Sequence, residues 1–179
     1  MALTEVFTGA NGTLGIAVAG TDAEQAQFDA ISGSYPGLEN VGRVTGVDIR
    51  VQTDLEEFHE VGKRHAASLH PGNVHVSGRV GRAYVNGALL YLLMGKSALA
   101  TSTGADGHPL PQFVLVLNLN DPALPDNTLK VQVFGVRFEN WGLHVPEDDF
   151  VLEDLCFKAK SIAVTDTEEG SEIAVAFPA

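Results

Sequence analysis

The chain of 179 residues has a single cysteine, Cys156, and few basic residues. One cysteine excludes an internal disulfide framework and a cysteine-rich zinc site, which favours a reduced compartment. The first residues lack the basic start and apolar run of a signal peptide, and no apolar run reaches the roughly 18–20 residues of a membrane helix. We therefore expect a chain that stays in the cytosol, or in something assembled there, with no membrane partner.

Positive charge is also scarce: the chain has 11 basic and 23 acidic residues, which give a formal net charge of −12. Sequence-independent nucleic-acid binding needs surplus Lys and Arg, so this balance argues against that class of protein. The length predicts one domain, 1–179, that is large enough to bury its own core.

Alternation of apolar and polar residues dominates the sequence and predicts strands. In residues 44–54, Val47, Ile49 and Val51 alternate with charged and amide residues. We expect strands at 44–54, 73–85, 113–119, 129–138, 154–164 and 171–177. The alternation slips phase at Gly135, as a β-bulge would cause.

Helix signals are few. Residues 87–94 form a continuous apolar run with Asn86 as N-cap and Gly95 just after it, which predicts a short buried helix. A second helix is indicated at 21–32 by a capping box. The sum predicts a mainly β fold, an antiparallel β-sandwich or open barrel with one packed short helix.

Residues 54–65 contain Glu56-x-x-His59, a spacing that carboxylate metal sites use. Such di-metal sites need a second motif and facing helices. The zinc-protease motif needs a histidine where the chain has Lys63. We interpret these histidines as surface or interface residues, and we expect no metal, no cofactor and no catalytic residues.

Other candidate chemistry is equally weak. The chain lacks Gly-x-Ser-x-Gly and phosphate-binding glycine loops. Cys156 lies in an alternating strand, which favours a packed residue. Three adjacent acids, Glu147, Asp148 and Asp149, resemble a solvated turn more than a calcium loop, whose oxygen ligands alternate around a glycine.

The connector between the first two long strands, 55–73, carries apolar residues among many charges. A connector of that length without its own fold tends to be functional or disordered. Leu55, Phe58, Val61 and Leu69 are spaced like anchors that order against a neighbouring protein.

The order of these features resembles tail tube proteins of tailed viruses and phages. Residues 42–95 contain a strand, the charged connector, a Gly-Asn-Val-x-Val-Ser-Gly strand and the apolar helix. Residues 131–164 contain a strand, an aromatic turn, an acidic Pro turn and a further strand, like the second hairpin of such proteins. The two segments cover about half of the chain.

The resemblance implies hexameric rings in which each subunit gives two hairpins to a 24-stranded inner barrel. Strands 43–55 and 74–85 form one hairpin, strands 129–138 and 155–165 the other, and helix 87–94 packs behind them. Stacked rings form the conduit through which a viral genome leaves the capsid. The order of the N-terminal segment, 1–42, before assembly is left open.

Site residues follow from this resemblance. The candidate ring-stacking contacts are Leu55, Phe58, Val61, Arg64 and Leu69. The candidate lumen residues are Asp48, Arg50, Gln52, Asp54, Ser77, Arg79, Lys130, Gln132, Lys158 and Lys160. The implied partners are further copies, the tape measure, sheath or terminator proteins of a tail, and DNA that passes without specific binding. The implied location is the virion tail, assembled in the host cytoplasm.

One expectation conflicts with the rest, because a DNA conduit should have an acidic or neutral bore and several candidates are cations. Either some strand faces slip by one residue, or acids such as Glu153 and Asp154 line the bore. Three alternatives stay open: the inner tube of a phage-derived injection device, a monomeric ligand-binding β-barrel, and a metal enzyme using Glu56 and His59.

Overall fold

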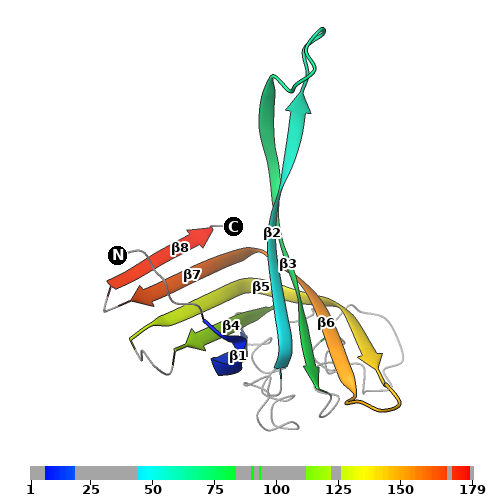
Figure 1. Cartoon of the computed structure of the whole chain (residues 1–179), viewed down its shortest axis with the longest axis vertical. Coiled ribbons are helices and arrows are strands. Elements are labelled where there is room, and N and C mark those ends of the chain that lie inside the picture. The colour runs from blue at the N-terminus through cyan, green and yellow to red at the C-terminus, as the bar shows by residue number, and fades with distance from the viewer. Residues whose placement is uncertain are drawn as a thin grey trace, which may run out of the picture.

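The computed structural model describes residues 7–18, 44–83, 90, 93, 112–121, 126–168 and 171–177. Eight strands form one antiparallel sheet in the order β1-β4-β5-β6-β3-β2, and β7 and β8 continue from β5 (Figure 1). The elements are a 3₁₀ turn η1 (Gly9–Asn11), β1 (Gly12–Val18), β2 (Val44–Phe58), β3 (Ser68–Ala83), β4 (Phe113–Asn120), β5 (Thr128–His144), β6 (Leu152–Ala159), β7 (Ser161–Glu168) and β8 (Ser171–Phe177).

Strand β5 belongs to both halves of the sheet. Its first part, 128–134, pairs with β4 and β7, and its second part, 137–144, pairs with β6. The first half of the sheet is therefore β1, β4, β7, β8 and the start of β5, and the second half is β2, β3, β6 and the end of β5. The expected mainly β, antiparallel fold is confirmed, and the sheet is open in the single chain.

The sheet bends where β5 passes from one half to the other. Three β5 steps, Val133 to Val136, match two β4 steps, Leu115 to Phe113, so the bulge expected at Gly135 is confirmed. Gly135 has a φ of 63°, which a side chain would strain. The backbone N–H of Lys160 donates to Phe134 O at 3.0 Å beside this bulge.

The strand expected at 155–165 is two strands, β6 and β7, and this part of the prediction is wrong. The chain bends at Lys160 because β6 pairs with the second part of β5 and β7 with the first part. The alternation in fact marks the break, because the apolar residues change phase from Leu155 and Phe157 in β6 to Ile162 and Val164 in β7.

Both halves of the sheet contribute to one hydrophobic core. Leu14, Ile16, Leu115 and Val133 come from the first half. Val76, Val80, Leu155 and Phe157 come from the second half. Phe113 and Phe138 stack across the bend with ring centroids 5.2 Å apart. Burial of these side chains provides the main favourable free energy of folding.

Most of the expected helix, 87–94, lies outside the described residues. Leu90 and Leu93 are described and both are helical, and Leu93 packs against the core. The second expected helix, 21–32, lies wholly outside them. Within 1–42, residues 7–18 are described and contain β1, an apolar strand that the sequence reading missed. No helix in the described residues is long and apolar enough to cross a membrane.

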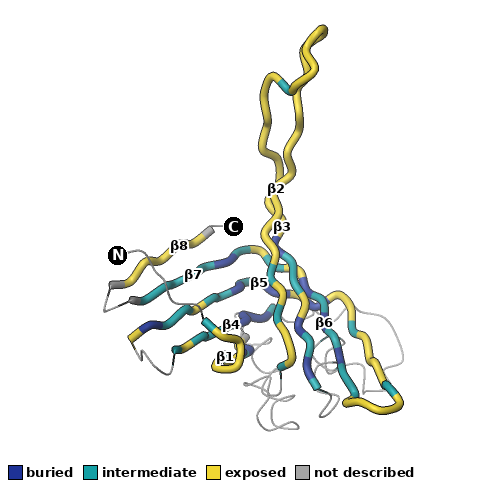
Figure 2. Tube along the Cα trace, viewed as in Figure 1, coloured by how far each residue is buried: buried dark blue, intermediate teal, exposed yellow. Residues whose placement is uncertain are grey.

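The β2–β3 hairpin is longer than expected. Pairing continues to Phe58 opposite Ser68, so about half of 55–73 is strand and residues 59–67 lie between the two strands. A register shift in β3 accommodates Pro71 and Gly72, residues that usually end a strand. We call residues 51–75 the arm; it projects beyond the rest of the described chain (Figure 1), and nearly all of it is exposed (Figure 2).

Candidate functional site

The second half of the sheet has a polar face that points away from the core. Cross-strand partners share a face, so the register places three rows of residues on it. The rows are Arg50, Ser77, Lys158 and Arg137; Asp48, Arg79, Cys156 and Asn140; and Gly46, Gly81, Asp154 and Gly142. Gln52 and His75 continue the face toward the arm, where Asp54 hydrogen-bonds to His75.

Seven of the ten candidate lumen residues thus come together on this polar face. Lys130 and Gln132 do not, because they lie on the first part of β5, between β4 and β7. Lys160 lies at the junction of β6 and β7, and its side chain occupies the space that a Cβ at Gly135 would need. Whether any of these residues lines a lumen stays a prediction.

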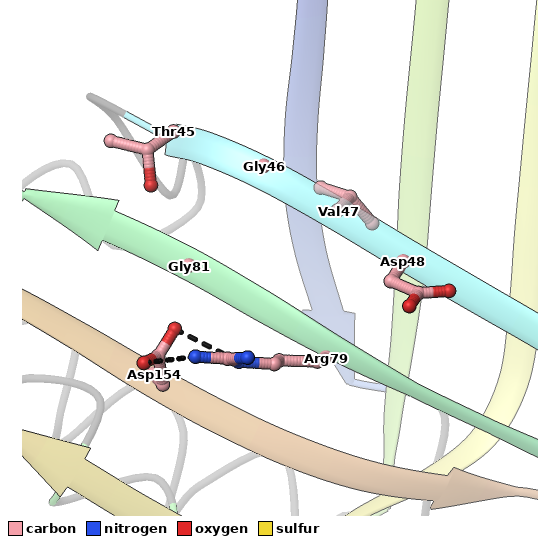
Figure 3. Close-up of a pocket in the computed structure, with 7 residues that line it drawn as sticks. All are labelled: Thr45, Gly46, Val47, Asp48, Arg79, Gly81 and Asp154. Carbon is pink, nitrogen blue, oxygen red and sulfur yellow. Dashed lines mark hydrogen bonds and ion pairs between the residues drawn. The ribbon is translucent and has the colours of Figure 1, made fainter.

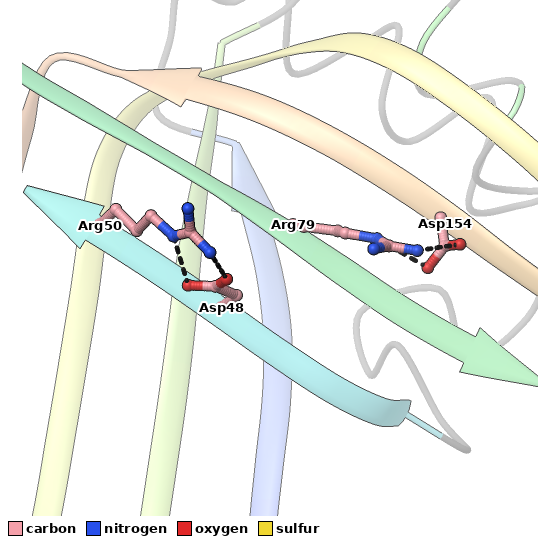
Figure 4. A network of polar contacts seen from close by, with 4 residues as sticks. All are labelled: Asp48, Arg50, Arg79 and Asp154. Atoms are coloured by element: carbon pink, nitrogen blue, oxygen red, sulfur yellow. Dashed lines mark hydrogen bonds and ion pairs between the residues drawn. The ribbon is translucent and has the colours of Figure 1, made fainter.

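Three of the four Lys and Arg side chains of the polar face are paired with a carboxylate, and Figure 4 shows two of these pairs. Arg50 Nη2 lies 2.8 Å from Asp48 Oδ2, and Arg79 Nε lies 3.0 Å from Asp154 Oδ1, with a second bond from its Nη2. Lys158 Nζ lies 2.9 Å from Glu139 Oε2. His75 Nε2 and Asp54 Oδ2 are 3.1 Å apart.

The two arginine–aspartate pairs shift the pKa of Asp48, Arg50 and Arg79. The hydrogen bond from Arg50 lowers the pKa of Asp48 below its ordinary value of 3.8. Bonds to Asp48 and Asp154 raise the pKa of Arg50 and Arg79, respectively. Asp48, Arg50 and Arg79 therefore stay charged at neutral pH.

The pairing removes the conflict over the charge of this face without any slip of strand phase. The face carries four cations, Arg50, Arg79, Arg137 and Lys158, and four carboxylates, Asp48, Asp54, Glu139 and Asp154, so its formal charges cancel. Asp154, one of the two acids suggested for the bore, lies on the face, in β6.

Glu153, the other suggested acid, points to the opposite side, so that suggestion is wrong. It is fully buried and accepts hydrogen bonds from Arg82 Nε and from Trp141 Nε1, the latter at 3.0 Å. Neighbouring residues of a strand point to opposite faces, so Glu153 and Asp154 could not both line one surface. A buried carboxylate of this kind requires a cation and hydrogen-bond donors.

A hollow of about 290 Å³ lies on the polar face between β2, β3 and β6 (Figure 3). It exists because Gly46 and Gly81 leave space between Asp48 and the Arg79–Asp154 pair. In Figure 3 the Arg79 guanidinium points at Asp154 and not into open space, so its charge is already neutralised by a carboxylate. The hollow therefore offers no unneutralised cation to an anionic ligand.

The arm presents the candidate stacking residues on different sides. Leu55 and Leu69 continue the apolar face of the hairpin, and Phe58, paired with Ser68, lies on the other face. Val61 and Arg64 lie at the tip, and all five are exposed. The apolar face also contains Val51 and Val74, which the sequence analysis did not select although their alternation marks them.

The metal hypothesis gains no support from the geometry. His59 hydrogen-bonds to Glu57, at 3.1 Å, while Glu56 is the cross-strand partner of His70. Across the described ranges, no three His, Cys, Asp or Glu side chains gather as a metal site would require. The acids 147–149 form the exposed turn between β5 and β6, where Asp149 accepts the N–H of Phe150 at 2.7 Å.

Comparison with known proteins gives matches in structure but not in sequence. No family model and no curated protein matches the chain. A chain of the anti-feeding prophage baseplate is similar over 92% of this chain and 97% of its own length, with 12% identity and a TM-score of 0.58. A chain of the sheath–tube complex of PVC, an extracellular contractile injection system, is similar over 93% of this chain and 95% of its own length, with 9% identity and a TM-score of 0.58.

Hcp1 from Salmonella typhimurium is similar over 94% of this chain and 95% of its own, with 11% identity and a TM-score of 0.52. The fold is thus shared with these solved chains, and the tail-tube-like fold expected from the sequence is confirmed. Identities this low concern the fold alone.

Proposed function

We propose that this chain is a structural tube subunit that assembles into rings, and that the rings stack into the tube of a phage-like tail or of a phage-derived injection device. The observation that carries the proposal is the second half of the sheet. It has two open edges, a polar face on one side and the core on the other.

The open edges are β2 and the second part of β5. Among the described strands, β2 pairs with β3 alone, and residues 137–144 of β5 pair with β6 alone. Long edges with unpaired backbone groups are templates for pairing with another chain. Because β5 and β2 run in opposite directions, a ring of identically oriented copies continues the antiparallel pattern at every junction.

Closing the ring in this way removes both edges and makes a barrel from four strands of each copy. With six copies, as the tail-tube resemblance implies, the barrel has 24 strands. The polar face then lines the lumen, since the core face is covered by the first half of the sheet. The cancelled charges of the polar face suit a passage through which a polymer moves without being held.

The arm has the second role in this proposal. Its apolar face carries Val51, Leu55, Leu69 and Val74, and each of these is at least 45% exposed in the single chain. Exposed apolar residues arranged along one face mark an interaction surface. We assign this face, together with Phe58, Val61 and Arg64, to contacts with a neighbouring ring.

The proposed role is assembly and not catalysis. Solved assemblies with this fold include a tube-terminating cap and a sheath–tube complex, and these support proteins of the same kinds as partners. The tape measure protein is a partner that the tail-tube resemblance alone implies. The natural location is then the tail of such a particle, assembled in the cytoplasm. The first candidate is a viral tail that passes DNA. The second candidate is an injection device that carries protein, and similarity to the anti-feeding prophage and PVC systems supports it.

Negative-stain electron microscopy of the purified chain tests the proposal, with rings or stacked tubes as the expected result. Phe58→Ala combined with Val61→Ser should leave single rings but shorten or abolish stacks, while the circular dichroism spectrum stays that of the unchanged chain. A species that remains monomeric at high protein concentration would refute the proposal. Tubes of normal length from the double variant would refute the role of the arm.

A further inference from the structure

Among the described residues, Arg137 is the cation of the polar face whose charge no carboxylate neutralises. In the described residues, no carboxylate oxygen lies within ion-pair distance of its guanidinium. Its cross-strand partner is Lys158, a like charge, and Lys158 already bonds to Glu139. Like charges opposite one another destabilise a strand pair. Arg137 lies in the second part of β5, at one open edge of the sheet.

The opposite open edge, β2, carries two carboxylates on the same face. Asp48 is held by Arg50, at 2.8 Å. Asp54 has the imidazole of His75 as its partner, at 3.1 Å, and this is not a permanent cation. Asp54 is half-exposed and has further acceptor positions for a donor that approaches from outside the chain. In the described part of the chain, each edge therefore has one charged residue without a permanent counter-charge, and the two residues have opposite signs.

Barrel geometry brings these two residues together. The row Arg50, Ser77, Lys158, Arg137 crosses all four strands and continues onto β2 of the next copy, displaced by the stagger of the barrel. When the stagger around a whole barrel, counted in residues, equals the number of strands, the strands tilt by about 36° from the barrel axis. This tilt is within the usual range for barrels. For four strands per copy, that stagger is about four residues.

The direction of the stagger follows from the handedness of the sheet. In Figure 4 the polar face is toward the viewer, and β6 and β2 lie on the left and right sides of β3 when β3 points upward. With this order, the right-handed twist of strands moves the row toward the C-terminal end of β2. The row starts at Arg50 on β2 of one copy and ends at Arg137 on its β5. It then reaches β2 of the next copy four residues after Arg50, at Asp54.

We propose that Arg137 of one copy and Asp54 of the next form a salt bridge across each β5–β2 junction, and that this contact fixes the register in which the ring closes. The inference depends on the proposed ring assembly and adds to it the partner residues and the stagger.

Charge reversal tests the contact. Arg137→Asp and Asp54→Arg should each place like charges at every junction and raise the protein concentration needed for ring assembly by about tenfold or more. Ring yield is measured by sedimentation and electron microscopy, with circular dichroism to verify folding. The double variant, with both reversals in one chain, should assemble at nearly the concentration of the unchanged chain.

Mixing the two single variants makes the test specific for a contact between copies. In a ring of alternating variants every junction has opposite charges, so an equimolar mixture should form rings that neither variant forms alone. A contact within one chain would not be restored by mixing. The matched control is Asp48→Arg with Arg137→Asp, which should not restore assembly at the proposed stagger.

The outcomes separate this inference from the function on which it rests. If the unchanged chain forms no rings, the proposed function itself is refuted. If the unchanged chain forms rings, the inference is overturned when single reversals assemble normally, or when neither the mixture nor the double variant recovers. Recovery with Asp48→Arg in place of Asp54→Arg also overturns it, because a different stagger would then bring the edges together.

Discussion

The base and the arm of the β2–β3 hairpin share one apolar face and have different surroundings. In the base, residues 44–50 and 76–83, the apolar face includes Val76 and Val80, which are 5% and 2% exposed. In the arm, the same face continues with Val51 and Leu55, which are 45% and 61% exposed (Figure 2). The first half of the sheet covers the base and ends before the arm begins (Figure 1).

The difference separates two uses of one sequence pattern. Apolar residues of the base are removed from water when the chain folds, so they stabilise the subunit. Apolar residues of the arm remain in water in the single chain, and they contribute free energy only when another copy covers them. Substitutions in the base should therefore change unfolding, and substitutions in the arm should change assembly.

The largest expected effect contrasts two phenylalanines. Phe157 is 1% exposed in the core, and Phe58 is 54% exposed in the arm. Phe157→Ala should lower the free energy of unfolding by about 3–5 kcal/mol, because it removes a packed ring and leaves a cavity. Phe58→Ala should change it by less than about 0.5 kcal/mol. Urea titration of dilute, unassembled subunit measures both, and Phe157→Leu serves if the alanine variant does not fold. Equal losses from the two alanine variants would contradict the separation.

A second contrast uses two acids with basic partners. Glu153, buried against Arg82 and Trp141, should be costly to replace, since Glu153→Gln removes the carboxylate that balances a buried guanidinium. We expect a loss of about 3–5 kcal/mol in unfolding free energy. The control is Glu60→Gln at the tip of the arm, where the exposed Lys63–Glu60 pair should matter by less than about 0.5 kcal/mol. A loss for Glu153→Gln as small as that of the control would show that the buried pair does not stabilise the base.

The sequence predicted much of the base because alternation reports burial directly. Val47 and Ile49 were correctly placed opposite Asp48 and Arg50, and the bulge at Gly135 was correctly located. The break at Lys160 was missed although the apolar residues change phase there, and the phase alone does not show which part of β5 each strand pairs with.

The arm was predicted less well for a different reason. Its strands contain acids, Pro71 and Gly72, and they look like a connector when burial is the criterion for a strand. They are strands because backbone pairing continues with both faces exposed. The ion pairs of the polar face were also missed: the residues of Arg79–Asp154 lie 75 positions apart, and only the β3–β6 register brings them together.

Two glycines show that the two faces of the base also differ. A Cβ at Gly78 would lie 2.5 Å from Phe157 Cζ and would also meet the backbone oxygen of Asp48, whereas a Cβ at Gly46 would meet nothing within 4 Å. Gly78→Ala should therefore cost about 1–3 kcal/mol by overpacking the core. Gly46→Ala should be neutral, to within about 0.5 kcal/mol. Thermal unfolding of both variants measures the difference, and a neutral Gly78→Ala would mean that Phe157 can move without loss.

The smallest expected effect is a pH dependence at the exposed Asp48–Arg50 pair of the base. The bond from Arg50 lowers the folded-state pKa of Asp48 below 3.8, so the unfolded carboxylate takes up a proton at higher pH than the folded one. The stabilisation is then fully present above about pH 4 and is lost as the pH falls through the lower, folded-state pKa. Asp48→Asn should be slightly less stable than the unchanged chain at pH 7, and the difference should close below pH 3.8 in urea titrations of unassembled subunit. Because both side chains are exposed, we expect the difference to shrink in high salt as well. A gap that stays constant from pH 7 to pH 3 would show that Asp48 acts through packing at the base and not through its charge.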